Sequence, residues 1–256
     1  EVISSAESVH KKSTGRKPDM QQLFRLVFRF VAAKLLSDRR VSPFRSVDSD
    51  SDPETVLTRV SRYYSQTEPV IEDAQTREAV AGAIWGAVSF QNLSVDALAD
   101  IYENTLVTEQ VRRKLGTHST PTSVARYVVS RLINEQSMSD TLQVVEPCAG
   151  HAIFLVAALE RLRDLLPSQL SPQERHRFFI RTLHGFEQDA FALEIGKLCL
   201  MLADFPFPDG WHLVSADVFA SPKFESALKR SDIVLCNPPF EDFSKDERQL
   251  YPNRRS

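Results

Sequence analysis

In the first part of the chain, apolar residues recur at three- and four-residue intervals, a spacing typical of helices. A polar, Ser- and Lys-rich stretch, residues 1–19, precedes them, and we interpret it as a flexible arm. Asp52 followed by Pro53 is an N-cap before a proline at the first helical position. The predicted helices span residues 20–36, 53–64, 71–90 and 95–115. The pattern therefore predicts an all-helical domain over residues 20–115.

The pattern changes after Gly116, where short apolar runs begin to alternate with helical stretches. The predicted strands span residues 142–146, 182–186, 211–216 and 232–236, and the helices residues 121–134, 151–166, 190–203 and 223–229. Such alternation predicts an α/β fold with a parallel sheet covered on both faces. Ligands bind at the carboxyl ends of the strands in such sheets. Residues 116–256 therefore form the second predicted domain, with its site at that edge.

Composition excludes several classes of protein. With 42% hydrophobic and 25% charged residues over 256 positions, the chain has the balance of a globular protein and not of a disordered or fibrous one. The net charge of −3 does not by itself indicate a nucleic-acid partner. Three cysteines are too few for a disulfide framework, so we expect a reducing compartment, the cytoplasm. Charged residues interrupt the apolar stretch 23–36, so we expect no membrane partner.

Two candidate binding motifs follow the first two strands. Small residues in Glu146-Pro147-Cys148-Ala149-Gly150-His151-Ala152-Ile153-Phe154 allow a ligand to approach the backbone before a helix N-terminus. An ordinary tight turn would look similar. Glu187, followed by Gln188, is placed to bind the two hydroxyls of a ribose, whereas Asp189 reads as a helix cap.

Two further motifs follow the third and fourth strands. Asp217-Val218-Phe219 offers a carboxylate and apolar neighbours for an adenine, or is a solvated loop. Asn237-Pro238-Pro239-Phe240 is the most specific signal in the chain. Two prolines fix a rigid turn, which aims the Asn237 side-chain oxygen and a nearby carbonyl at one point, and two such acceptors suit a planar NH₂ group. Phe240 adds a face on which a base can stack.

The ordered set of these motifs, together with Gly116-Thr117-His118-Ser119-Thr120-Pro121, resembles the amino-group DNA methyltransferases. It is most similar to the N6-adenine enzymes of restriction-modification systems with a C-terminal recognition domain (the gamma arrangement). Type I modification subunits and fused restriction-methylation enzymes belong to this group. The resemblance covers roughly residues 95–243 and includes the lead-in Ile101-Tyr102-Glu103. It implies a Rossmann-like sheet that binds S-adenosylmethionine, with no metal.

The resemblance also implies roles for individual residues. Those that would bind the cofactor are Thr117, His118, Ser119, Thr120, Pro121, Glu146, Pro147, Cys148, Gly150, Ala152, Phe154, Glu187, Gln188, Asp217, Val218, Phe219 and Asn237. The catalytic tetrapeptide would be Asn237, Pro238, Pro239 and Phe240. Glu146 stands where the family has Asp, and Ala152 stands where it has a second Gly.

The implied reaction transfers a methyl group to the exocyclic N6 of an adenine flipped out of duplex DNA. Cytosine N4 methylation uses the same chemistry and stays open. The implied partners are DNA and a specificity or restriction subunit or domain.

The chain begins at Glu1 and has four of the seven strands of such a sheet, so we expect a fragment that ends before the recognition domain and methylates poorly by itself. Two alternatives remain. One is a methyltransferase acting on protein glutamine or RNA. The other is a catalytically degenerate assembly module, for which Leu23, Val27, Phe30 and Val31 form a candidate contact stripe.

Overall fold

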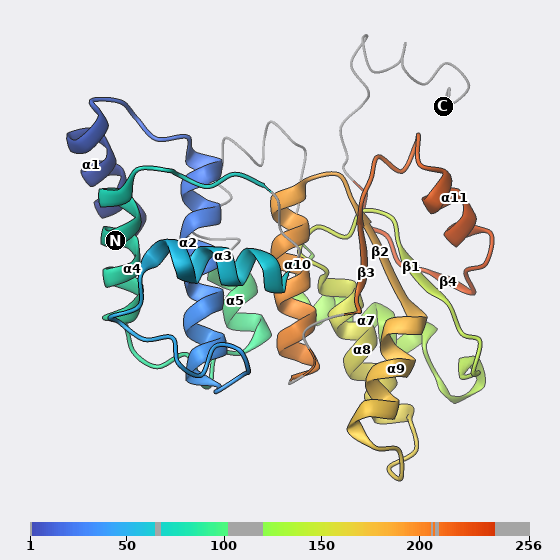
Figure 1. Cartoon of the computed structure of the whole chain (residues 1–256). Helices are drawn as coiled ribbons and strands as arrows, with labels where there is room; N and C mark the ends of the chain where they lie inside the picture. The colour runs from blue at the N-terminus through green and yellow to red at the C-terminus, as the bar shows by residue number, and fades with distance from the viewer. Residues whose placement is uncertain (1, 65–67, 102–119, 206, 208–209, 239–256) are drawn as a thin grey trace. The chain divides into compact units, whose positions relative to one another are not determined.

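Figure 1 shows a computed structural model of the chain, which describes residues 2–64, 68–101, 120–205, 207 and 210–238. The chain divides into two compact units, Glu1–Leu98 and Ala99–Ser256. The boundary predicted from the sequence, between residues 115 and 116, lies outside the described residues. In the described part of the chain, no helix is long and apolar enough to cross a membrane.

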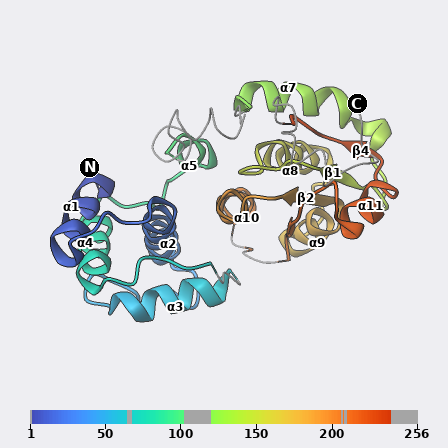
Figure 2. The same cartoon turned by 90° about the horizontal axis from the view of Figure 1, so that it is seen from above.

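The first unit is helical, as its apolar spacing predicts. Its helices are α1 (Val2–Thr14), α2 (Met20–Asp38), α3 (Pro53–Tyr63) and α4 (Ala74–Trp85), and α5 (Val95–Ile101) follows at the boundary between the units. Helices α1, α3 and α4 all contact α2 (Figure 2). Leu23, Val27 and Phe30 of the candidate contact stripe are buried on α2, so this part of the stripe belongs to the core.

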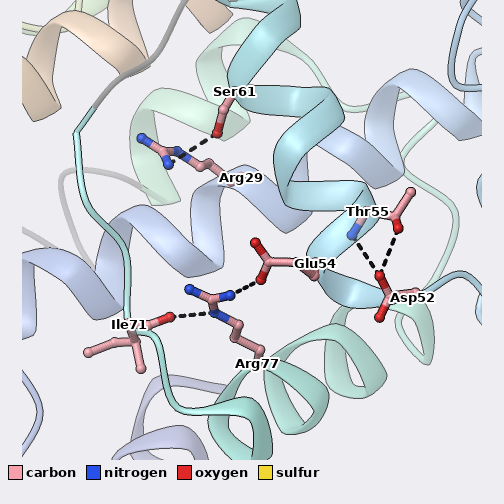
Figure 3. A network of polar contacts seen from close by, with 7 residues as sticks. All are labelled: Arg29, Asp52, Glu54, Thr55, Ser61, Ile71 and Arg77. Carbon is pink, nitrogen blue, oxygen red and sulfur yellow. Dashed lines mark hydrogen bonds and ion pairs between the residues drawn. The ribbon is translucent and has the colours of Figure 1, made fainter.

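Aspartate caps fix where these helices begin. The Asp52 carboxylate accepts the Thr55 backbone N–H at 2.8 Å before α3, and the Asp73 carboxylate accepts the Thr76 N–H at 2.9 Å before α4. Arg77 then joins the two helices, because it donates to the Glu54 carboxylate and, at 2.6 Å, to the Ile71 carbonyl (Figure 3). Helix α4 is shorter than the predicted span 71–90, since Asp73 caps it and it ends before Gly86.

The structure corrects the prediction of a flexible arm over residues 1–19. Helix α1 occupies most of that segment and packs against α4. Ser13 Oγ donates to the Asp73 carboxylate at 2.7 Å, and His10 Nδ1 lies 3.1 Å from Thr76 Oγ1. Polar contacts therefore hold α1 in place, with only Ala6 buried in the helix. A hydrophobic pattern does not show contacts of this kind.

The second unit contains a four-stranded parallel sheet, as predicted. Its strands are β1 (Val144–Glu146), β2 (Leu183–Glu187), β3 (His212–Ser215) and β4 (Ile233–Val234). They lie in the order β3-β2-β1-β4. The chain leaves β1 in one direction to form β2 and β3, and then returns to place β4 on the other side of β1. This reversal is the switch point at which parallel sheets bind ligands.

Helices surround the sheet in the order expected for this topology. They are α7 (Thr122–Leu132), α8 (Ile153–Leu165), α9 (Pro172–Thr182), α10 (Ala190–Ala203) and α11 (Pro222–Leu228). Helices α8 and α11 lie on opposite faces of the sheet (Figure 2). Phe186 of β2 packs edge-on against Phe224 of α11, with ring centroids 5.2 Å apart. Gly185 faces α8, because a Cβ there would stand 2.8 Å from Leu155.

Helix α9 was not predicted from the sequence. Pro172 occupies its first turn, and Ser171 and Glu174 form a capping box before it. The main apolar residues of α9 are the consecutive positions 178–180 near its end, so the pattern lacks the three- and four-residue spacing of a helix even though its start signal is strong.

Candidate active site

Backbone and carboxylate hydrogen bonds tie the turns after β1, β2 and β3 to one another. The Glu187 carboxylate accepts the Gly150 N–H at 2.7 Å and the Asp189 N–H at 2.8 Å. The Ala149 N–H donates to the Phe186 carbonyl at 2.9 Å. The Ala216 N–H donates to the Glu187 carbonyl at 3.0 Å. Glu187 is thus the residue on which the three turns converge.

The turn after β1 has the open backbone that a bound ligand requires. Gly150 has φ 51°, and a Cβ at this position would meet no protein atom within 4 Å. Ala152, at the N-cap of α8, has φ 65° and no side-chain cap. The first N–H groups of α8 therefore receive nothing from an N-cap side chain, and such groups can bind an anionic or polar ligand.

Glu146 is the last residue of β1, and the residue is only 2% exposed. Burial raises its pKa well above the usual range, and a hydrogen bond from the Leu155 backbone partly offsets this. Its Oε2 has no hydrogen-bond partner in the structure. An unpartnered buried oxygen is costly, and it would be satisfied by a ligand donor at this edge of the sheet.

Two cysteines meet where β1 and β4 end. The Cys148 thiol donates a hydrogen bond to Cys236, which lowers the pKa of Cys236 to about 7 and raises that of Cys148. Sequence reasoning named Cys148 but not Cys236, since their contact depends on the pairing of β1 with β4.

Asn237 stands three residues after β4, the strand that pairs with β1. Its Nδ2 donates to Thr120 Oγ1 at 3.0 Å. Thr120 precedes α7 and is 9% exposed. The structure therefore joins two predicted motifs that are 117 residues apart in the chain.

The remaining predicted residues differ in their placement. Asp217 accepts the Phe219 N–H at 2.8 Å in the turn after β3. Val218 packs instead against the apolar cluster of Phe186 and Phe224, so less of the Val218 side-chain surface is left to contact a ligand. Pro121, Gln188 and Pro238 are exposed, Pro147 is partly buried and Phe154 is buried. Thr117, His118, Ser119, Pro239 and Phe240 lie outside the described residues.

One further residue near the site was not predicted. Gly196 of α10 lies against the turn after β1, because a Cβ there would stand 3.2 Å from the Ala152 Cβ and 3.4 Å from the Gly150 carbonyl oxygen. A single glycine inside a helical pattern is the only sequence signal for this role. Among the residues that the structure describes, no group of three or more His, Cys, Asp or Glu side chains could hold a metal ion.

Comparisons with solved structures support the fold. The chain is similar to a modification subunit assigned to a type I restriction enzyme from Vibrio vulnificus YJ016, with 16% identity and a TM-score of 0.64. The alignment covers 98% of this chain and 62% of that one. It is also similar to the ATP-dependent Type ISP restriction-modification enzyme LlaBIII bound to DNA, with 14% identity and a TM-score of 0.52 over 95% of this chain and 18% of that one.

The chain thus spans less than two thirds of the length of either structure. It matches none of the curated protein sequences with which it was compared. A family model described as N-6 DNA Methylase matches residues 93–255, which include all four strands and every predicted site residue. The chain belongs to the N-6 DNA methylase family.

Proposed function

We propose that the protein containing this chain transfers a methyl group from S-adenosylmethionine to the N6 amino group of adenine in DNA, within a restriction-modification system. The observation that carries the proposal is that Asn237 follows β4, and that β4 pairs with β1, whose following turn is bonded to Glu187. Family membership supports the reaction class, and the fold supports the placement of the cofactor at the switch point.

The residues at this edge fit S-adenosylmethionine. The open backbone at Gly150 and the start of α8, where the N-cap residue makes no side-chain hydrogen bond, suit its methionine end, and the unpartnered Glu146 oxygen suits a donor group. The Glu187 carboxylate suits the ribose hydroxyls, and Asp217 with Phe219 suits the adenine. When bound, the cofactor supplies an electrophilic methyl group on a sulfonium.

The side chains of the protein then act on the target amine. The lone pair of an adenine NH₂ group is delocalised into the ring, so the nitrogen is a poor nucleophile. In the proposal, hydrogen bonds to Asn237 Oδ1 and the Pro238 carbonyl draw this nitrogen towards a tetrahedral geometry and orient it for in-line attack. Acceptors fixed before the reaction gain rate because they need no reorganisation as charge develops.

Binding tests the cofactor half of the proposal. Titration calorimetry with S-adenosylmethionine should show micromolar affinity for the wild type and a loss of about tenfold or more, about 1.4 kcal/mol, in Glu187→Ala. Glu187→Gln is the matched control, since its amide oxygen can still accept the Gly150 N–H. If both variants bind as tightly as the wild type, Glu187 does not contact the ribose.

Activity tests the chemistry. The full-length protein, with any partner subunit, is incubated with unmethylated plasmid DNA, and the nucleosides are separated by mass spectrometry. We expect N6-methyladenine from the wild type and none from Asn237→Ala when the cofactor is saturating for both. Detection of N4-methylcytosine in place of N6-methyladenine would show that the target base is cytosine. Methylated RNA or methylated protein glutamine without methylated DNA would overturn the proposal.

A further inference from the structure

Thr120 and Asn237 form a partly buried contact between the segment before α7 and the segment after β4. Asn237 Nδ2 donates to Thr120 Oγ1 at 3.0 Å. Thr120 is 9% exposed and Asn237 is partly buried, so water competes weakly for this hydrogen bond. The resemblance assigns Thr120 only to the wall of the cofactor pocket.

The contact matters because a side-chain amide has two different ends. One end is an acceptor and the other a donor, and the two are nearly equal in shape. A target NH₂ group donates in the plane of its ring, so it needs the oxygen of Asn237 and is repelled by the nitrogen. The Asn237 amide is therefore competent in only one of its two orientations.

Thr120 Oγ1 receives the Nδ2 end, which turns the Oδ1 end of the amide away from Thr120. We propose that Thr120 is a positioning residue, whose hydroxyl fixes the Asn237 amide in the orientation that accepts the hydrogen bond of the target amine. This inference rests on the proposed function, since it concerns the same tetrapeptide. It gives Thr120 a role in the methyl-transfer step in place of the role in cofactor binding that the resemblance implies.

The two roles of Thr120 predict different kinetic effects. A residue that only lines the cofactor pocket changes the affinity for S-adenosylmethionine and leaves the rate at saturation intact. A residue that fixes the amide changes the rate at saturation and leaves cofactor affinity intact. Thr120→Val removes the hydroxyl at nearly constant shape, and Thr120→Ser keeps the hydroxyl. Thr122→Val, two residues further on at the start of α7, is the matched control.

The kinetic experiment uses the full-length protein, with any partner, at saturating cofactor and DNA. We expect Thr120→Val to lower the single-turnover rate by about tenfold or more with a cofactor Kd within about twofold of the wild type. Thr120→Ser and Thr122→Val should keep most of the rate. An unchanged rate with weakened cofactor binding in Thr120→Val would overturn the inference, as would an equal loss in Thr120→Ser.

A second measurement is independent of activity. In ¹⁵N-asparagine-labelled protein, the two Asn237 side-chain amide protons are assigned by their loss in Asn237→Ala, and the proton that bonds to Thr120 should exchange slowly with water. Thr120→Val should speed this exchange and Thr120→Ser should keep it slow. If the signals do not respond to Thr120→Val, the inference is wrong even in an active enzyme. If they respond but the wild type transfers no methyl group to DNA, the proposed function fails and the contact stands.

Discussion

Ala152 has a left-handed backbone conformation that residues with a side chain rarely adopt, and it does so at the centre of the candidate site. Gly196 is the compensating residue, because only the absence of a side chain on α10 leaves room for the Ala152 methyl group. The family has glycine where this chain has Ala152. The two positions therefore form a packing pair, and a change at one should alter the effect of a change at the other.

We expect Gly196→Ala to destabilise the second unit by about 1 kcal/mol, since overpacking outweighs the gain in helix propensity. It should also weaken binding of S-adenosylmethionine. Ala152→Gly in the same chain should restore both, with a coupling energy of about 1 kcal/mol in denaturant titrations. Gly82→Ala, in a helix where a Cβ meets nothing within 4 Å, is the control and should stabilise. Additive effects of the two changes would contradict the pairing.

The buried carboxyl of Glu146 makes stability depend on pH. Its folded-state pKa is raised by burial, so above its ordinary pKa of 4.5 the folded state holds a proton that the unfolded state has lost. The free energy of unfolding should therefore fall as pH rises above that value, by up to about 1.4 kcal/mol for each pH unit until the folded-state pKa is reached. Glu146→Gln should raise the melting temperature more at pH 8 than at pH 5. An equal rise at both values would mean that the carboxyl is not the cause.

The place of the candidate residues at one edge of the sheet was easier to predict than their contacts. Glu187 and Asn237 follow strands of a parallel sheet, and strand ends meet at one edge, so the sequence predicted that they would gather there. The bond from Asn237 to Thr120, the thiol pair of Cys148 and Cys236, and the fit of Gly196 depend on elements far apart in the chain. The spacing of residues along a sequence does not predict contacts between segments that are far apart in the chain.

At the scale of elements, prediction succeeded where an apolar face drives the fold. The alternation of strand-like and helix-like patterns predicts all four strands and the helices α8, α10 and α11 beside the sheet. Helices α1 and α9 were missed because they are polar and held by side-chain hydrogen bonds and caps. The start signal of α9 is a local capping box and the contacts of α1 are with residues about 60 positions away, and hydrophobic periodicity detects neither.

The capping box of α9 gives a direct test of this explanation. Ser171 Oγ accepts the Glu174 N–H at 3.2 Å, and the Glu174 carboxylate accepts the Ser171 N–H at 2.8 Å. Ser171→Ala should lower the free energy of unfolding by about 1 kcal/mol, as measured by urea denaturation. Ser168→Ala, at an exposed position just before the helix, should change it by less than about 0.5 kcal/mol. Equal effects would show that α9 is not stabilised by its cap.

At the scale of the molecule, the chain combines two units that each have a core of their own. The predicted site residues that the structure describes all belong to the second unit. The cofactor should therefore act on one unit only. At about 100 times its Kd, a ligand that binds only the folded state stabilises that state by about 2.7 kcal/mol.

Hydrogen exchange with mass spectrometry can locate this stabilisation along the chain. We expect S-adenosylmethionine to slow exchange most in peptides that contain the Gly150 and Glu187 turns and the start of α8, because the proposed cofactor site lies there and hydrogen bonds join these turns to one another. Peptides from α1 to α4 should exchange at unchanged rates, since their hydrogen bonds lie within the helical unit. Glu187→Ala is the control and should show little protection at the same cofactor concentration. Protection that extends to α2 would instead show that the two units respond to the cofactor as one.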